Sequence, residues 1–141
     1  MLVEAIEYET MAKVEDGHWW YVGMRQIARA WLDPLPHEIM WHSLDAGCGT
    51  GGNVNRLLNQ YGIAHGLDLH PLALELAQTK SPNPFVRGSV LDLPFTHASL
   101  DLVTSFEVLY HRAVPDEITA LREVWRVLKP NGYVLLRMPS Y

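Results

Sequence analysis

Apolar and polar residues along the chain fall into blocks with two different periods. Short runs rich in apolar and β-branched residues predict five strands, at 42–46, 64–69, 84–89, 99–106 and 133–139. Between them apolar residues recur every three or four positions, the spacing of a helix that buries one face, at 53–61, 71–80 and 115–128. Strands that alternate with helices predict an α/β fold: a Rossmann-like doubly wound sheet, mainly parallel, with helices on both faces and truncated after the fifth strand.

The helix predicted at 115–128 has a recognisable start, a buried face and an end. Its first residues, Pro-Asp-Glu, suit a first turn, where proline loses no hydrogen bond and negative charge is favourable. Five apolar residues share one face and are predicted to pack against the sheet: Ile118, Leu121, Val124, Trp125 and Leu128. We expect Arg122, Glu123 and Arg126 to form the face toward water, and the turn at 129–132, Lys-Pro-Asn-Gly, to end the helix.

A segment of different character precedes the first strand. Residues 19–32 are predicted to form a helix with one apolar face on the sheet: Trp20, Met24, Ile27, Ala28 and Trp31. Arg25 and Arg29 lie on another face of that helix, and residues 3–14 favour a further helix. We therefore divide the chain into an N-terminal helical segment, 1–38, that packs on the sheet, and a Rossmann-like core, 39–141, within one structural domain.

Composition excludes several classes of function. The 141 residues are 48% hydrophobic, which suits one globular domain. A net charge of -5, without any cluster of Lys and Arg, argues against a nucleic acid or a membrane surface as partner. We find no signal peptide and no apolar run long enough to span a membrane. The single cysteine, Cys48, predicts a reducing, cytoplasmic location, and the dispersed histidines predict no metal site.

Residues 47–52, with the sequence GCGTGG, follow the first predicted strand directly. Glycines at a strand–helix junction permit a tight turn and let a ligand lie against the backbone, at the sheet edge where such folds bind ligands. The loop fits the dinucleotide pattern G-x-G-x-x-G, and Asp68 lies where a ribose-binding acid is expected. Asp45 would repel a pyrophosphate but attract a sulfonium or ammonium group, which points to S-adenosylmethionine (SAM).

The chain resembles the class I SAM-dependent methyltransferases, within the broad group that includes the small-molecule enzymes. LDAGCGTG, GLDLH, GSVLDLPF, SLDLVTSFEVLYH and LREVWRVLKPNGYVLLRMP resemble motifs of this family in the same order. HWWYVGMR, ahead of the first strand, resembles a segment found in one subset of these proteins. The resemblance implies an enzyme that transfers a methyl group from SAM to an unidentified small-molecule acceptor.

The resemblance also implies which residues hold the cofactor. It places a first group of residues near the methionine moiety of SAM: Asp45, Ala46, Gly47, Gly49, Gly51, Phe106, Tyr21 and Arg25. Of these, Tyr21 and Arg25 would reach the methionine carboxylate. It places a second group of residues around the adenosine: Asp68, Leu69, Val90 and Leu91. Of these, Asp68 would accept hydrogen bonds from the ribose hydroxyls. His111, after the fourth strand, is the candidate general base, with a packing role as the alternative. Glu107 is expected to be a solvated surface residue.

Two departures from the family pattern bear on function. Ser89 stands where many relatives have an aspartate that holds the adenine amino group, so weaker cofactor binding is expected. The chain ends after the strand at 133–139, whereas relatives continue through a helix and an antiparallel pair of strands. That strand would then be a bare apolar edge, which predicts either a fragment of a longer protein or a homodimer formed through the edge.

Two other functions stay open on the sequence alone. The first is a catalytically inactive or incomplete SAM-binding module, which Ser89 and the early end of the chain favour. The second, ranked lower, is an NAD-dependent oxidoreductase, because the glycine pattern also fits a dinucleotide, although Asp45 argues against it. The methyl acceptor is not named by any motif, and fold-level analogy cannot supply it.

Overall fold

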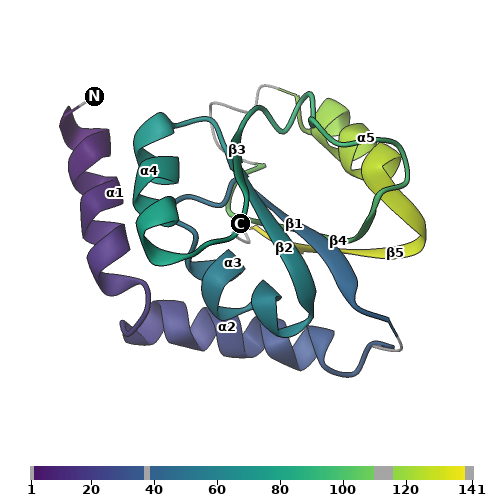
Figure 1. The fold of residues 1–141 in the computed structure, drawn as a ribbon, viewed down its shortest axis with the longest axis horizontal. Helices are drawn as coiled ribbons and strands as arrows, with labels where there is room; N and C mark the ends of the chain where they lie inside the picture. Colours follow the sequence, from purple (N-terminus) through teal and green to yellow (C-terminus); the bar gives the residue numbers. More distant parts are fainter. Residues whose placement is uncertain (1, 37–38, 110–115, 139–141) are drawn as a thin grey trace.

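The computed structural model describes residues 2–36, 39–109 and 116–138, which fold around a five-stranded parallel sheet (Figure 1). The strands are β1 Trp41–Ala46, β2 Gly62–Asp68, β3 Phe85–Arg87, β4 Leu100–Phe106 and β5 Leu128–Arg137. Their order across the sheet is β3-β2-β1-β4-β5, and every neighbouring pair is parallel. The predicted Rossmann-like α/β fold is confirmed, and the strand order reverses beside β1, the place where open sheets of this kind bind ligands.

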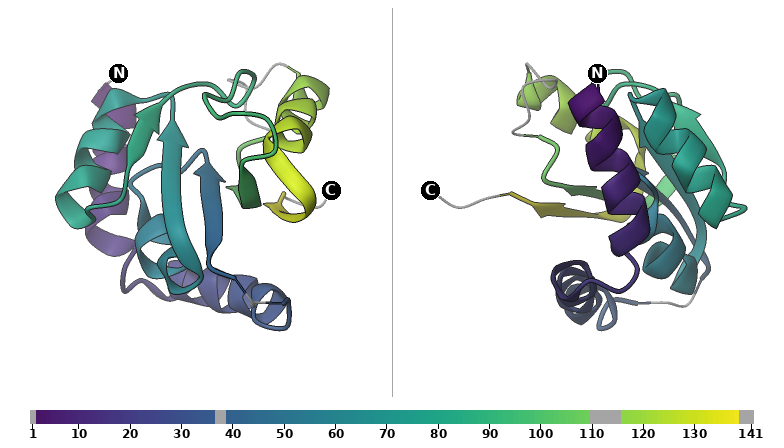
Figure 2. Two further views of the ribbon diagram at one scale, coloured as in Figure 1. Left: turned by 45° about the vertical axis from the view of Figure 1, so that its right-hand side comes forward. Right: turned by 90° about the vertical axis from the view of Figure 1, so that its left-hand side faces the viewer.

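Helices cover both faces of the sheet (Figure 2). The longer helices are α1 Leu2–Val14, α2 Trp19–Leu32, α4 Pro71–Lys80 and α5 Glu117–Val127. One buried cluster joins α2, the short helix α3 (Gly52–Arg56) and α4 to one face. A second cluster joins α5 to the opposite face through Ala120, Val124 and Val127. Helix α1 lies alongside α4 (Figures 1 and 2), so two N-terminal helices stand next to the ends of the central strands.

The helix predicted over 53–61 is interrupted in the structure. Helix α3 is followed by a separate turn of 3₁₀ helix at Leu58–Gln60, with Leu57 between them at φ -120° and ψ -65°. Leu57 and Leu58 are both fully buried. Consecutive residues of one α-helix point in directions about 100° apart, so a single regular helix cannot bury both side chains equally well. The break lets both leucines enter the core.

Helix α2 has the predicted bounds but a different buried face. Arg25, Ala28 and Leu32 are buried, whereas Ile27 and Trp31 are exposed. The helix is held at its far end by Arg29, whose guanidinium donates hydrogen bonds to the α3–3₁₀ segment at the Arg56 carbonyl and the Gln60 amide. Arg25 precedes Arg29 by about one helical turn and is buried on the same side. The predicted apolar face is therefore wrong for Ile27 and Trp31, whereas Ala28 is buried as predicted.

Helix α5 shows the same kind of difference. Its buried residues are Ala120, Val124 and Val127, whereas three residues of the predicted buried face are exposed: Ile118, Leu121 and Trp125. Glu123 and Arg126, expected to face water, instead clamp the β3–β4 loop. The Glu123 carboxylate accepts a hydrogen bond from the Leu93 N–H, and Arg126 donates to the Leu93 and Phe95 carbonyls. These bonds satisfy backbone groups of a long loop and fix the rotation of the helix.

Strand β5 begins at Leu128, immediately after α5, and not after the predicted turn. Its pairing with β4 shifts register between Leu100 and Leu102, where Lys129–Gly132 are accommodated as an irregularity with Asn131 at φ 66°. Beyond that point the pairing is regular and brings Phe106 opposite Arg137. Within the described residues, β5 has β4 as its one neighbour and no helix is long and apolar enough to cross a membrane.

Candidate active site

The carboxyl ends of β1, β2 and β4 border two adjoining cavities. The first, about 690 Å³, contains Asp68 and is called the Asp68 cavity; the second, about 230 Å³, contains Arg25 and is called the Arg25 cavity. Both are lined by the same five residues at their junction: Met11, Gly47, Gly49, Phe106 and Glu107. An elongated ligand that crosses the glycine loop would therefore occupy both.

The glycine loop is shaped by left-handed backbone and by the lack of space for side chains. Gly47, Gly49 and Gly51 have φ values of 83°, 54° and 83°, which other residues adopt only with strain. A Cβ atom at Gly47 would lie 2.3 Å from a methyl carbon of Val108, which also lines the Asp68 cavity. Gly51 differs, because a Cβ there would meet Ala77 and Phe85. Gly47 and Gly49 thus face the cavities, whereas Gly51 serves helix–strand packing.

Asp68, at the end of β2, is held in a fixed orientation on the cavity wall. Its two carboxylate oxygens accept hydrogen bonds from the N–H groups of Gly49 and His70, each at 2.9 Å. Every carboxylate oxygen can accept a second hydrogen bond, so both remain able to bind a ligand. Leu69 and Val90 line the same cavity. This arrangement suits a ligand with two adjacent hydroxyl groups, which would donate hydrogen bonds to Asp68 between the apolar side chains of Leu69 and Val90.

Asp45, at the end of β1, lines neither cavity. It is buried, and one carboxylate oxygen accepts a hydrogen bond of 2.7 Å from the Thr104 hydroxyl on β4. Burial raises the pKa of the Asp45 carboxyl to about 7; nearby Asp68 raises it further, and the Thr104 hydrogen bond opposes the change. The structure places Asp45 two residues before Gly47, buried and outside the lining of both cavities.

The Arg25 cavity is closed on one side by helix α2. Arg25 is only 5% exposed and donates a hydrogen bond of 3.2 Å to the Asp16 carbonyl. Tyr21 lines the same cavity, and burial followed by the charges of Glu15 and Glu107 raises the pKa of its phenol, so its hydroxyl remains a donor. Arg25 and Tyr21 are thus brought together with the glycine loop, as the sequence predicted.

Helix α1 contributes residues that sequence reasoning missed. Tyr8 and Met11 line the Asp68 cavity, and the Tyr8 ring lies 4.8 Å from that of His70. Mainly because of burial, the pKa of Tyr8 is raised to about 12. The C-terminal end of the helix is anchored by a 2.6 Å ion pair between the buried Glu15 and Lys80 of α4. No local motif marks these residues, because α1 reaches the cleft only by packing along α4.

A second missed feature is a pair of charged residues on β4 and β5. Arg137 and Glu107 both line the Arg25 cavity, with 3.6 Å between the Arg137 Nε and the Glu107 Oε1. Glu107 was expected to be a solvated surface residue; its side chain is 37% exposed, and it also lines the Arg25 cavity and faces Arg137. Its backbone has a φ of 61°. A usable signal exists in hindsight: both residues lie at the carboxyl ends of strands predicted to be neighbours in the sheet.

Some predicted site residues lie elsewhere. Ala46 and Leu91 line neither cavity; both belong to or pack against the core cluster on the α5 face. Ser89 accepts a hydrogen bond from the Leu91 N–H at 3.0 Å and also lines neither. His111, the candidate base, lies outside the described residues.

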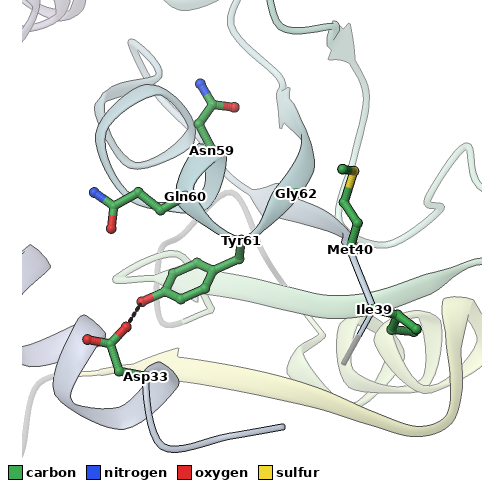
Figure 3. Close-up of a pocket in the computed structure, with 7 residues that line it drawn as sticks. All are labelled: Asp33, Ile39, Met40, Asn59, Gln60, Tyr61 and Gly62. Atoms are coloured by element: carbon green, nitrogen blue, oxygen red, sulfur yellow. Dashed lines mark hydrogen bonds between the residues drawn. The ribbon is translucent and has the colours of Figure 1, made fainter. Parts of the chain in front are cut away.

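A third cavity, about 640 Å³, lies at the opposite, amino-terminal end of β1 and β2 (Figure 3). Tyr61 and Asp33 form its polar part, joined by a 2.6 Å hydrogen bond from the phenol to the carboxylate. Burial and this bond raise the pKa of Tyr61, so it stays protonated. Since open parallel sheets bind ligands at the carboxyl ends of their strands, the functional site is assigned to the first two cavities.

Comparison with known proteins identifies the fold and the family. Residues 44–136 match the family described as the methyltransferase domain. The chain belongs to this methyltransferase family. The match covers the glycine loop, Asp68, the β3–β4 loop and β4, so most residues of the Asp68 cavity fall within it. The Arg25 cavity falls within it only in part, because Arg25, Tyr21 and Arg137 lie outside the matched residues.

Relatives of known name support the same family. The chain is 37% identical over 101 residues to a demethylmenaquinone methyltransferase of Lactococcus lactis, a match that covers 65% of this chain and 39% of the relative. It is 36% identical over 96 residues to a phthiotriol/phenolphthiotriol dimycocerosates methyltransferase of Mycobacterium leprae, covering 64% and 35% of the two chains. Each of these matches therefore spans well under half the length of the relative.

Solved structures agree on the fold. A Haloferax volcanii protein solved in complex with the Trm112 methyltransferase activator has a TM-score of 0.74 and 30% identity, over 95% of this chain and 56% of that one. A Methanococcus maripaludis protein, 20% identical, has a TM-score of 0.75 and covers 94% of this chain and 61% of its own, which shows the fold alone.

The cofactor of this family is SAM, and the described residues fit it. The left-handed loop leaves no space for side chains at Gly47, so a ligand can approach its backbone there. The fixed carboxylate of Asp68 suits ribose hydroxyls, and a cationic ligand group near the buried Asp45 would favour the charged form that burial opposes. The family is one of methyltransferases, which supports neither the oxidoreductase nor the dinucleotide interpretation.

Proposed function

We propose that the protein is a SAM-dependent methyltransferase that acts on a small-molecule acceptor, with the Asp68 cavity for the adenosine and the Arg25 cavity for the reacting groups. The observation that carries this proposal is the junction of the two cavities at Gly47 and Gly49, two and four residues after the buried Asp45. An elongated cationic ligand that crosses the junction would meet a carboxylate at its sugar and a second one near its charged centre.

Each described site residue takes a role consistent with its surroundings. Asp68 accepts hydrogen bonds from the two ribose hydroxyls, and Leu69 and Val90 contact the adenine. Arg25, with Tyr21 beside it, binds the methionine carboxylate, for which a guanidinium offers paired donors. Gly51, Ala46 and Leu91 support the site through the packing of the loop and the core.

The chemistry asked of the protein is mainly positioning. Bound SAM supplies an electrophilic methyl group, and the chain holds the acceptor in line with it and excludes water. Trp20 and Phe106 line the Arg25 cavity together with Met11 and Met24, which makes the wall beside the reacting groups apolar and aromatic. A role for His111 as general base stays a prediction.

The acceptor we propose is a flat, apolar molecule with an oxygen substituent. The aromatic and methionine-rich wall favours a planar ring. Relatives named for demethylmenaquinone and for phenolphthiotriol compounds point to quinone- and phenol-containing substrates, although this chain matches only part of each. A cytoplasmic location, predicted from the single cysteine, is part of the same proposal.

The first test is cofactor binding measured by calorimetry with S-adenosylhomocysteine. We expect Asp68→Asn to weaken binding about tenfold or more, because hydrogen bonds from the ribose to a charged acceptor are lost. Asp92→Asn is the matched control, since Asp92 is exposed and lines none of the three cavities. Absence of heat with the unmodified chain, or equal heat from both variants, would contradict the proposal.

Transfer itself is tested with methyl-labelled SAM and 1,4-naphthalenediol as a planar, hydroxyl-bearing acceptor. Transfer of the methyl label to the organic acceptor would support the proposed methyltransferase activity. Binding of S-adenosylhomocysteine without label in any acceptor of this class would instead favour the inactive SAM-binding module.

We also infer that a second copy of the chain pairs along the outer edge of β5. In the described part of the chain this edge has no partner strand, and its residues are apolar and β-prone. The pairing would satisfy backbone groups that the sheet leaves open.

A further inference from the structure

The end of β5 places a guanidinium in the Arg25 cavity, beside two aromatic rings. The Arg137 guanidinium carbon lies 4.8 Å from the ring centroid of Phe106 and 5.3 Å from that of Trp20. Contacts of this length attract a cation to the ring faces and hold it in one orientation. Trp20 and Phe106 also line the Arg25 cavity. The planar guanidinium is therefore fixed at the cavity wall by residues from α2 and β4.

One donor of this guanidinium is buried and unused within the described residues. Its Nε is buried and has no hydrogen-bond partner within the described parts of the chain. The Glu107 carboxylate stands 3.6 Å away, close enough for charge attraction but longer than a hydrogen bond. Buried donors without partners are rare in folded proteins, because each forfeits the hydrogen bonds that it made in water. A ligand oxygen would satisfy this one.

The backbone supports the arrangement at some cost. Glu107 has a left-handed φ of 61°, uncommon for any residue other than glycine, and its N–H donates a hydrogen bond of 2.8 Å to the Arg137 carbonyl. The β4–β5 register that pairs Phe106 with Arg137 continues directly into this bond. Unfavourable backbone conformations of this kind persist where the surrounding structure holds them, and they are frequent at ligand sites.

The Arg25 cavity thus contains two arginines, whereas SAM offers one carboxylate. Arg25 comes from α2 and Arg137 from β5, and the two line the same cavity. Since Arg25 is assigned to the methionine carboxylate, the second guanidinium is left for a different anionic group. Phe106, next to Arg137, lines both cavities and so lies at their junction, where the methyl group would be transferred.

We propose that Arg137, oriented by Glu107, Trp20 and Phe106, binds an anionic oxygen of the methyl acceptor, a phenolate or enolate on a planar ring. This rests on the proposed function and narrows its acceptor to an ionisable hydroxyl-bearing ring. A cation beside the oxygen favours its ionised form, which is the more nucleophilic one. Arg137 is a binding residue in this proposal, and Glu107 positions it.

The test uses 4-nitrophenolate, at a pH above the pKa of the phenol, against 4-nitroanisole, which has the same ring and no ionisable oxygen. Both are titrated into protein saturated with S-adenosylhomocysteine, and the nitrophenolate absorption band reports on its contact with a cation. We expect saturable binding of the phenolate with a shifted band, and binding of the anisole about tenfold weaker or more.

Variants assign the effect to Arg137. We expect Arg137→Gln to weaken phenolate binding about tenfold or more and to leave anisole binding unchanged, because a charge-assisted hydrogen bond is lost. Arg137→Lys keeps the charge without the planar donors and should give an intermediate loss. Arg122→Gln removes the same charge from the exposed face of α5 and should change nothing. Thermal unfolding of each variant shows that it is folded.

A further experiment tests whether Arg137 binds an anionic oxygen of the methyl acceptor or the carboxylate of the cofactor. S-adenosylhomocysteine carries the amino-acid carboxylate, and 5′-methylthioadenosine lacks it. If Arg137→Gln weakens binding of the first but not of the second, Arg137 binds the cofactor carboxylate and the proposal is wrong. Equal binding of phenolate and anisole, or no saturable phenolate binding, also overturns it. Failure of S-adenosylhomocysteine to bind at all refutes the proposed function instead, and the phenolate titration without it still tests Arg137.

Discussion

At the scale of single residues, two aspartates at the ends of adjacent strands show how environment decides role. Asp68 is half-exposed on a cavity wall and is oriented by two backbone N–H groups. Asp45 is buried, with the Thr104 hydroxyl as its hydrogen-bond donor. In the proposed function, the first accepts hydrogen bonds from the ligand, whereas the second acts through a charge that depends on pH.

The sign of this dependence follows from the pKa of Asp45. Burial raises it from 3.8 to about 7; Asp68 and Glu15 raise it further, and Thr104 and Arg137 lower it. Between these two values the folded chain holds a proton that the unfolded chain has lost. The contribution of Asp45 to the free energy of unfolding is therefore fully present below about pH 3.8, and it is lost as the pH rises through about 7.

We expect Asp45→Asn to become more stable than the unmodified chain as the pH rises from about 4 to about 7, by on the order of a few kcal/mol. Asparagine keeps an acceptor for the Thr104 hydroxyl and has no charge to bury. Urea unfolding at a series of pH values measures the difference. Asp92→Asn should show no such trend, and a difference for Asp45→Asn that is constant across the pH range would contradict the assignment.

At the scale of elements, polar contacts outweigh apolar spacing in setting the rotation of two helices. Arg29 ties α2 to the α3–3₁₀ segment, and Arg126 with Glu123 ties α5 to the β3–β4 loop. The α5 contact satisfies partly buried backbone groups that would otherwise lose their hydrogen bonds, whereas the α2 contact joins exposed groups. The result for α2 is functional, since the rotation that exposes Trp31 brings Arg25 to the cavity.

The rotation of α5 is testable by comparing adjacent residues. Val124→Ala should lower the free energy of unfolding by about 1–3 kcal/mol, because it removes two methyl groups from the core. Trp125→Gln should change it by less than about 0.5 kcal/mol, because Trp125 is 82% exposed. Urea denaturation of both variants measures the contrast. A larger loss at Trp125 would mean that this face is covered in solution.

At the scale of the whole molecule, the fold is a sheet whose carboxyl-terminal edge is enclosed by segments distant in sequence. Helices α1 and α2 line the cavities from one segment of the chain, and the ends of β4 and β5 line them from others. Figure 2 shows how these elements are arranged around the sheet. The sheet itself has β3 and β5 as its outermost described strands. Of these β5 is the longer, at ten residues against three, so it offers the larger surface for pairing.

We expect the unmodified chain to sediment as a dimer at micromolar concentration, through pairing of β5 edges. Val134→Lys should shift it toward the monomer, because a charged side chain on an edge strand opposes pairing. Thr79→Lys, an exposed position on α4, is the control and should leave the sedimentation unchanged. A monomer for the unmodified chain across the concentration range would remove this inference.

The sequence by itself determined the type and order of the elements, the glycine loop and the place of Asp68. These depend on local periodicity and on the conformational freedom of glycine, which are properties of neighbouring residues. It also placed Arg25 on a helix before the first strand, although apolar spacing assigned that helix the wrong buried face.

Only the tertiary structure decided which helix faces are buried, that α1 reaches the cofactor cleft, and that Arg137 meets Glu107, Trp20 and Phe106. Each of these depends on packing or strand register between distant segments, and apolar spacing along one element carries no information about polar partners on another. The β4–β5 register aligns Phe106 with Arg137, and packing on α4 brings Tyr8 to Asp68. The site is therefore a local motif completed by long-range contacts.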